Sequence, residues 1–279
     1  MVLQVLWVLK ITAIVMTLTI FGCVSPASRF HHHAQNQGLD RHIEGSLVIY
    51  QRGPLLDGQP IHIYFDGDGM PSLGRGRIAT DPTSRNMLIL DLMAADPNST
   101  VLIGRPCYYR ADSECDESLW TNRRYSPAVV DPMTDAINAL IARYPNSPVM
   151  LIGYSGGGTL AMLAAPAISR LDTLVTIAAN LDTAAWTTRH AYTPLLGSLN
   201  PADRSPLRPG IKQIHFIGDK DSNVPAEIMQ HVVQLQPMAI LEIVADFDHS
   251  CCWVNSWRES VAWIESLEHV ETHGRCAPR

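Results

Sequence analysis

Charged side chains are scarce in this 279-residue chain, and positive charge is not in excess. Charged residues make up 17% of the sequence, hydrophobic residues make up 46%, and the formal net charge is -6. A chain this hydrophobic and this weakly charged is not a largely disordered one. An acidic body is not attracted to nucleic acid or to an anionic membrane surface, so neither is predicted as a partner of the folded part.

The N-terminal segment has no hydrophobic run long enough for a comfortable membrane span. One basic residue, Lys10, precedes the apolar stretch of residues 11–22, and together they predict a signal peptide over residues 1–22. The alternatives are a secretory signal that is cleaved elsewhere and an uncleaved anchor helix that extends back through residues 5–8. In each case the chain is expected to leave the cytoplasm.

The end of this segment, Ile20-Phe21-Gly22-Cys23, resembles a bacterial lipobox, with Phe21 in place of the usual small or β-branched residue. The resemblance implies that Cys23 is lipidated and that the protein is a lipoprotein of the bacterial cell envelope, anchored to a membrane and facing the periplasm. Val24, standing where an aspartate would favour the inner membrane, favours the outer one. Membrane contact is therefore expected through the lipid anchor.

Export permits disulfides among the five cysteines that follow Cys23. Cys107 and Cys115 flank one loop and are the predicted pair. Cys251, Cys252 and Cys276 stay unassigned, as a vicinal pair or with one free thiol. No spacing among these cysteines is typical of a zinc site, and no metal or organic cofactor is predicted.

Residues 23–40 show no helical periodicity, and we expect them to form a tether between the membrane and a single domain over residues 41–279. From Glu44 on, short apolar runs alternate with longer helical patterns. The alternation is typical of βαβ units and predicts an α/β fold with a mostly parallel central sheet flanked by helices. The strands are expected over residues 46–50, 61–65, 100–103, 149–152, 171–178, 211–217 and 240–244.

Two helix starts are predicted from residues that commonly cap helices. Thr83 or Ser84 is expected to cap one helix, and Asp131 with Pro132 is expected to begin another. Residues 180–209 break into prolines with little periodicity and are a candidate lid. A final amphipathic helix, starting at Trp253, is expected to pack on the sheet.

Glycines surround one serine in Gly153-Tyr154-Ser155-Gly156-Gly157-Gly158, between an apolar run and a helical segment. In the order strand, Gly-x-Ser-x-Gly, helix, the glycines permit a sharp turn that exposes the serine hydroxyl above the sheet edge. The N–H groups at the helix start, that of Gly156 first, are predicted to stabilise an oxyanion there. A phosphate-binding loop is the alternative, but this loop lacks the lysine that such loops place before Ser or Thr.

A serine hydroxyl becomes a good nucleophile only with a base that takes its proton and an acid that orients the base. His249 lies between the last strand and the last helix, whereas competitors such as His231 lie within helices or strands. Asp221 is preferred to Asp219 as the acid because Val-Pro follows at residues 224–225. Both partners follow strands at the edge where open α/β sheets bind ligands.

The stretches GYSGG, GDKDSNVP and DHS, in this order, resemble the α/β-hydrolase superfamily over nearly the whole exported chain. The resemblance implies the α/β-hydrolase fold, with residues 180–209 as a short lid insertion after the sixth strand. It implies catalytic roles for Ser155, Asp221 and His249. FDGDG, GRPCYY, AANLD, GSLNP and DHSCCW resemble, more narrowly, a group of largely uncharacterised exported bacterial hydrolases, which implies no substrate.

The superfamily role of oxyanion donor maps to the backbone N–H groups of Gly156 and Asp68, with Gly67 as the other candidate. Where the superfamily usually has His-Gly, this chain has Asp66-Gly67. A carboxylate beside an oxyanion opposes the developing charge unless it is turned away or paired with a cation such as Arg105 or Arg124.

The predicted function is therefore hydrolysis of an ester or related acyl bond in a small-molecule substrate, through an acyl-enzyme. The alternatives are transfer of the acyl group to an alcohol, and a non-catalytic binding lipoprotein on the same scaffold. The distance between His249 and Ser155 separates the enzyme from the binding protein.

Overall fold

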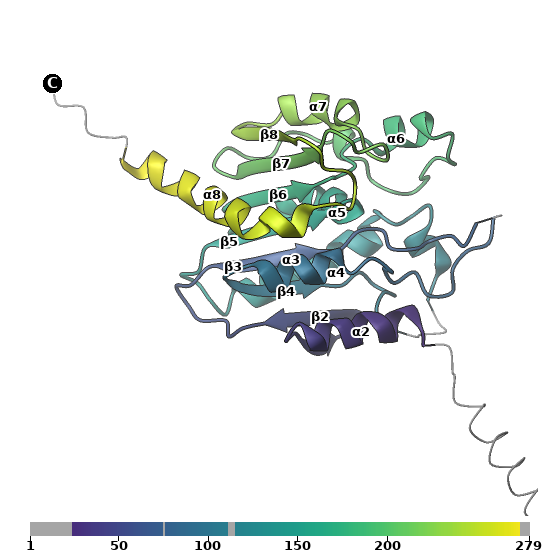
Figure 1. Ribbon diagram of the computed structural model, residues 1–279, viewed down its shortest axis with the longest axis horizontal. Helices are drawn as coiled ribbons and strands as arrows, with labels where there is room; N and C mark the ends of the chain where they lie inside the picture. The colour runs from purple at the N-terminus through teal and green to yellow at the C-terminus, as the bar shows by residue number, and fades with distance from the viewer. Residues whose placement is uncertain (1–23, 75, 111–114, 274–279) are drawn as a thin grey trace, which may run out of the picture.

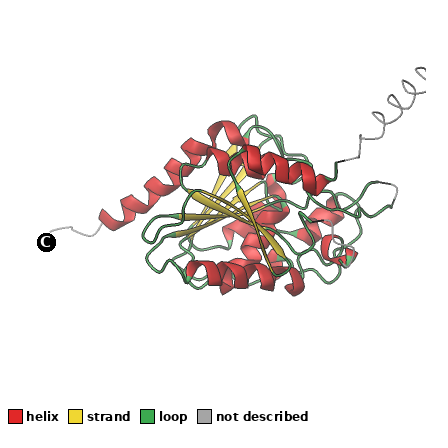
Figure 2. Cartoon of the chain, turned by 90° about the horizontal axis from the view of Figure 1, so that it is seen from below, coloured by secondary structure: helices red, strands yellow, loops and turns green. Residues whose placement is uncertain are grey.

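The computed structural model describes residues 24–74, 76–110 and 115–273. Its strands form one eight-stranded sheet in the order β1-β2-β4-β3-β5-β6-β7-β8, and helices cover both faces (Figures 1 and 2). β1 pairs with β2, and β2 with β4, in antiparallel fashion, while all other neighbours run parallel. The predicted mostly parallel sheet flanked by helices is confirmed.

The strands and helices have the following bounds. The strands are β1 Asp40–Glu44, β2 Leu47–Arg52, β3 Ile61–Phe65, β4 Ser99–Ile103, β5 Val149–Tyr154, β6 Thr173–Ile177, β7 Lys212–Gly218 and β8 Ala239–Val244. The α-helices are α2 Pro26–Asn36, α3 Leu88–Ala95, α4 Pro127–Ile141, α5 Gly156–Ala164, α6 Thr183–Arg189, α7 Ala226–Gln234 and α8 Trp253–His273. Short 3-10 helices are η1 Glu117–Trp120, η2 Ala165–Ala167 and η3 Pro201–Asp203.

The middle of the sheet is apolar because it is covered on both faces. Every residue of β3, β5 and β6 is buried, and β5 lies between the other two. A parallel strand buried on both sides favours a continuous apolar run, which is what residues 149–152 provide. Because the parallel strands share one direction, the loops that follow β3, β5, β7 and β8 meet at one edge of the sheet.

The predicted caps of α3 were wrong. The Thr83 hydroxyl accepts the backbone N–H of Tyr109 at 2.9 Å, and the Ser84 hydroxyl donates to the carbonyl of Asn86 at 2.7 Å, so both side chains are engaged elsewhere. The helix begins later, at Leu88, whose N–H donates to the side-chain oxygen of Asn86 at 2.9 Å. Tertiary contacts outweigh the local capping preference here.

The predicted start of α4 at Asp131-Pro132 was also wrong. The helix begins about one turn earlier, with Ser126 at the cap position and Pro127 in the first turn, so that Pro132 lies inside the helix. Pro127 offers the same preset φ as Pro132 at an earlier position. The apolar face of the helix is buried, and this packing offsets the hydrogen bond lost at Pro132.

The segment predicted as a tether is folded onto the domain. Residues 26–36 form α2, with the buried side chains Ala27, Phe30 and Ala34 on one face. The Phe30 ring is fully buried, and its centroid lies 4.4 Å from that of Tyr109 and 5.5 Å from that of Tyr50. Ser28, Arg29 and three histidines stand between these positions, so the three buried residues do not stand out as an apolar pattern in the sequence.

Strand β1 was not predicted because it carries no apolar pattern. It is an edge strand whose side chains are mostly exposed.

The predicted signal peptide (residues 1–22), Cys23 and Cys276 lie outside the described residues. Among the helices that the structure describes, none is both long and apolar enough to span a membrane.

Candidate active site

Ser155 occupies a strained turn between β5 and α5. Its backbone has φ 52° and ψ -123°, a conformation that non-glycine residues rarely adopt, and its N–H donates to the carbonyl of Ile177 at 2.8 Å. A side chain at Gly153 would collide with the backbone of Gly157, and one at Gly157 with the carbonyl of Phe65. The glycines are therefore needed where the elbow passes close to neighbouring backbone, and the turn presents the serine hydroxyl at the sheet edge.

Three predicted residues from distant parts of the chain meet in one line of hydrogen bonds. His249 Nε2 lies 3.0 Å from Ser155 Oγ, and His249 Nδ1 lies 2.8 Å from Asp221 Oδ2. The other oxygen of Asp221 accepts the backbone N–H groups of Asn223 at 2.9 Å and Val224 at 2.8 Å. The Asp221 side chain is fully buried, so the turn after β7 holds its carboxylate toward the imidazole.

Asn223 is a site residue that the sequence reading missed. Its side-chain Nδ2 lies 3.1 Å from His249 Nε2, on the same imidazole nitrogen that faces Ser155. Its carbonyl accepts the indole N–H of Trp186 at 3.1 Å and lies 2.8 Å from His190 Nε2. The predicted lid segment, residues 180–209, is thus joined to the loop that carries the acid.

Two backbone N–H groups beside Ser155 are open to a ligand. Gly156 and Asp68 line a cavity of about 840 Å³ together with Ser155. In the described part of the chain, neither of their N–H groups has a hydrogen-bond acceptor. The N–H of Gly67 instead donates to the Asp66 carboxylate at 2.7 Å, which leaves Asp68 as the better placed of the two candidate donors.

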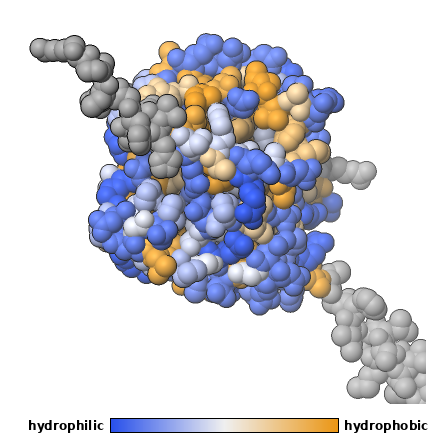
Figure 3. All heavy atoms as spheres, turned by 60° about the vertical axis from the view of Figure 1, so that its left-hand side comes forward, coloured by the Kyte–Doolittle hydropathy of each residue, from blue (hydrophilic) through white to orange (hydrophobic). Residues whose placement is uncertain are grey.

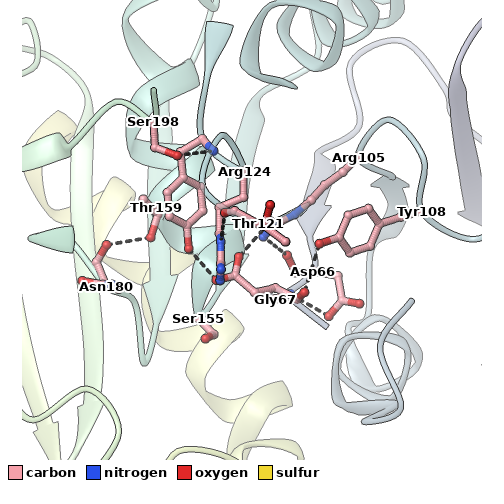
Figure 4. A network of polar contacts seen from close by, with 12 residues as sticks. Asp66, Gly67, Arg105, Tyr108, Thr121, Arg124, Ser155, Thr159, Asn180 and Ser198 are labelled. Carbon is pink, nitrogen blue, oxygen red and sulfur yellow. Dashed lines mark hydrogen bonds and ion pairs between the residues drawn. The ribbon is translucent and has the colours of Figure 1, made fainter. Parts of the chain in front are cut away.

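The Asp68 carboxylate is neutralised from two sides. Its oxygens lie 2.8 Å from Arg105 Nη1 and 3.0 Å from Arg124 Nη1, and the Tyr125 hydroxyl donates to it at 2.7 Å. Figure 4 shows Arg105 and Arg124 reaching toward this point above Ser155. Burial alone would raise the pKa of Asp68, but the two guanidinium groups and the tyrosine hold it at about 2. The carboxylate of Asp68 is thus paired with both of the arginines that the sequence analysis named as candidate partners.

Asp66 is buried without a cation of its own. Its carboxylate accepts the Tyr109 hydroxyl at 2.8 Å and the Gly67 N–H at 2.7 Å. Burial raises its pKa to about 6, and these two donors, which favour the ionised form, offset only part of the effect. Asp66 is not among the residues that line the cavity, and its carboxylate fixes the loop through the N–H of Gly67.

Because of Asp66, the stability of the protein is predicted to fall as the pH rises from about 4 to about 6. Its pKa is about 6 in the folded protein and about 3.9 in an unfolded chain, so the folded state binds more protons in this window. Asp66→Asn is expected to remove the fall and to raise the free energy of unfolding at pH 7 by about 1 to 3 kcal/mol. Urea unfolding at pH 4, 5, 6 and 7 measures both effects, and a variant with the same pH slope as wild type would contradict the prediction.

The predicted disulfide between Cys107 and Cys115 is present, with a Cα–Cα distance of 5.7 Å. The structure also joins Cys251 to Cys252, the vicinal pair that the sequence left open, while Cys276 lies outside the described residues. This bond lies in the turn directly after His249. Within the described ranges, no three His, Cys, Asp or Glu side chains are grouped closely enough to hold a metal ion.

No protein-family model matches the chain, and no curated protein matches it by sequence. Solved structures do resemble it. A membrane phospholipase A, described as a bacterial virulence factor, aligns with a TM-score of 0.58 at 13% identity, over 96% of this chain and 99% of that one. An esterase from Thermogutta terrifontis aligns with a TM-score of 0.57 at 13% identity, over 87% and 97% of the two chains.

A serine hydrolase homologue from Coxiella burnetii aligns with a TM-score of 0.55 at 12% identity, over 82% of this chain and 96% of its own. These identities are too low to carry a substrate from one protein to another. The narrower resemblance to an exported bacterial group stays a prediction. By its sheet order and these neighbours, the chain has the α/β-hydrolase fold.

Proposed function

We propose that this protein is a serine hydrolase that cleaves a carboxylic ester or a related acyl bond. The observation that carries the proposal is the 3.0 Å distance between Ser155 Oγ and His249 Nε2. The serine stands at a strained elbow, and the imidazole is oriented by a buried carboxylate, that of Asp221. This is the arrangement in which a hydroxyl becomes a nucleophile.

The proton path follows from the hydrogen bonds. In the attacking state Nδ1–H of His249 donates to Asp221, so Nε2 carries the lone pair that accepts the proton of Ser155. Oγ then bonds to the acyl carbon, and the imidazolium returns the proton to the leaving alcohol. A water activated by the same nitrogen releases the acyl group from Ser155.

The negative charge that forms on the acyl oxygen is assigned to the N–H groups of Gly156 and Asp68. The start of α5 adds the favourable end of its dipole to the same place. The Asp68 carboxylate does not oppose this charge strongly, because Arg105 and Arg124 are both paired with it. The two ion pairs therefore reduce the repulsion that the carboxylate of Asp68 would otherwise exert on an oxyanion.

The hydrolase is favoured over the non-catalytic binding lipoprotein by the same geometry. A binding protein has no need of a base within hydrogen-bond reach of Ser155, and the binding alternative predicted a wide separation from His249. Esters are proposed over other acyl bonds because the structural neighbours include an esterase and a phospholipase A. The envelope location and the lipid on Cys23 are part of the proposal, and the mass of the mature N-terminus tests them.

A fluorophosphonate probe tests the proposed nucleophile. Wild type should be labelled covalently, because a serine activated by a base attacks the phosphorus of the probe and displaces fluoride. Ser155→Ala should take up no label. Ser250→Ala is the matched control, since Ser250 is an exposed serine next to His249 and should be dispensable. Equal labelling of wild type and Ser155→Ala would end the proposal.

A further inference from the structure

Large apolar side chains are exposed around the mouth of the cavity. They stand on two segments, residues 71–79 and 190–198, and members of both segments line the cavity itself. The exposed fractions run from 41% to 71% for Ile78, Leu73, Tyr192 and Leu196. A gathering of exposed apolar side chains around one opening marks a site of contact with another apolar body.

The two segments are joined into one surface. The Trp120 indole donates to the carbonyl of Ala79 at 3.0 Å, and the Asn122 side chain donates to the carbonyl of Leu196 at 2.9 Å. Residues 117–122 therefore bridge the two segments. We call the exposed parts of residues 71–74, 76–79 and 190–198 the mouth surface.

The charge beside the mouth surface is opposite to the net charge of the chain. Exposed arginines stand on it or beside it at Arg77, Arg85 and Arg189. Asp81 is the only acidic residue within residues 71–87 and 183–199, and the bridging residues 117–122 add one exposed carboxylate, that of Glu117. The Asp81 carboxylate is already engaged by the backbone N–H groups of Ala27 and Thr83, each at 3.0 Å. The net charge of -6 for the whole chain therefore does not describe the local charge of this surface.

The folded chain begins at the same end of the molecule. The hydrogen bond from Ala27 to Asp81 places the first turn of α2 against residues 71–87. Figure 1 shows that α2 starts on the side where the loops after the parallel strands gather. Cys23, the predicted lipidation site, precedes Ala27 by four residues, and four extended residues span at most about 14 Å.

We propose that the mouth surface docks on an anionic phospholipid bilayer, so that the cavity opens directly onto the acyl esters of that membrane. Apolar side chains enter the boundary between headgroups and acyl chains, and arginines beside them are attracted to the anionic headgroups. This replaces the expectation, drawn from net charge, that an anionic membrane surface is not a partner. The choice of a lipid ester as substrate rests on the proposed function, while the docking does not.

A second apolar surface provides the contrast. It lies over β8 and α8, where Figure 3 shows apolar side chains gathered, and it includes Val244 and Trp263. Carboxylates stand among its side chains at Glu242 and Glu259. These acidic groups would be repelled by an anionic bilayer, so this surface is not expected to dock there.

Hydrogen exchange of the full chain in vesicles tests the docking. The vesicles contain phosphatidylethanolamine with phosphatidylglycerol, and the reference is the same chain in a neutral detergent. Peptides over residues 71–79 and 190–198 are expected to exchange about five-fold or more slowly in vesicles. Peptides over residues 235–244 should exchange at the same rate in both.

Matched variants then separate docking from chemistry. Leu73→Ser/Leu196→Ser should lose the protection and lower kcat/KM for vesicle phospholipid by about 10-fold or more, because less apolar area enters the bilayer. Its turnover of a soluble short-chain ester should stay within two-fold of wild type. Leu235→Ser/Met238→Ser removes two apolar side chains, 68% and 46% exposed, from the turn before β8 at the opposite edge of the sheet and should match wild type in every assay.

The other possible results each overturn a stated part of the proposal. Protection over residues 235–244 instead, or none, would overturn the docking, as would protection that depends on protein concentration without vesicles and so reports a second copy. Docking without hydrolysis of either ester would keep the membrane surface and remove the proposed function. Hydrolysis of the soluble ester alone, with docking intact, would remove the lipid ester as substrate.

Discussion

Replacing His249 with alanine is expected to lower kcat for ester hydrolysis by about 10⁴- to 10⁶-fold, as much as Ser155→Ala does. Without the base, the hydroxyl proton loses its acceptor, the Nε2 atom that lies 3.0 Å from Ser155 Oγ. Since the two residues act in one step, the double variant should be no slower than either single one. Steady-state kinetics on a chromogenic ester measures all three.

The acid supplies a matched pair of variants for the same test. Asp221→Asn is expected to lower kcat by about 10³- to 10⁴-fold, because the amide favours the wrong imidazole tautomer. Asp219→Asn should stay within two-fold, since Asp219 accepts the backbone N–H of Asp246 at 2.7 Å and does not touch the histidine. His231→Ala is the control for the base. Equal losses in Asp219→Asn and Asp221→Asn would contradict the assignment of the acid.

The fold was predictable where buried elements need a recognisable pattern of apolar residues. Residues 149–152 and 61–65 are apolar because they lie in central strands, and such runs are readable without a structure. β1 was missed because an exposed edge strand is held by backbone hydrogen bonds, which leave no trace in side-chain type. α2 was missed because its buried stripe rests on a single large side chain, Phe30.

The candidate site was predictable where the fold determines the position of a residue in the sequence. Ser155, Asp221 and His249 each follow a strand in the order expected for this fold, so sequence position predicts that they meet, and the hydrogen bonds show that they do. Asn223 and Tyr125 escaped notice because their roles depend on where loops cross in space. The Asp68 pairing lay between these cases: its need for a cation was deducible, and only the structure shows that both Arg105 and Arg124 meet it.

Asp68→Ala is expected to lower the free energy of unfolding by about 3 to 5 kcal/mol. Arg105 is 2% exposed and Arg124 is largely buried, so removing the shared carboxylate leaves two cations with little water to compensate them. Asp68→Asn keeps the shape of the side chain and should lose nearly as much, because the charge is the missing element. Urea unfolding at pH 7 measures the loss.

Two further variants show whether charge or packing causes the loss. Asp68→Ala/Arg105→Met removes a buried cation together with its partner and should recover most of the stability, since less charge is left uncompensated. Asp246→Asn removes a carboxylate charge from an ion pair with Lys220 at the surface, where water screens the charge, and keeps a side chain that tolerates the φ of 65° at this position, so the unfolding midpoint should stay unchanged. If the double variant is less stable than Asp68→Ala, Arg105 stabilises the fold through packing, and the charge argument fails. The backbone N–H of residue 68 survives all these changes, so the folded variants should still be labelled at Ser155 by the fluorophosphonate.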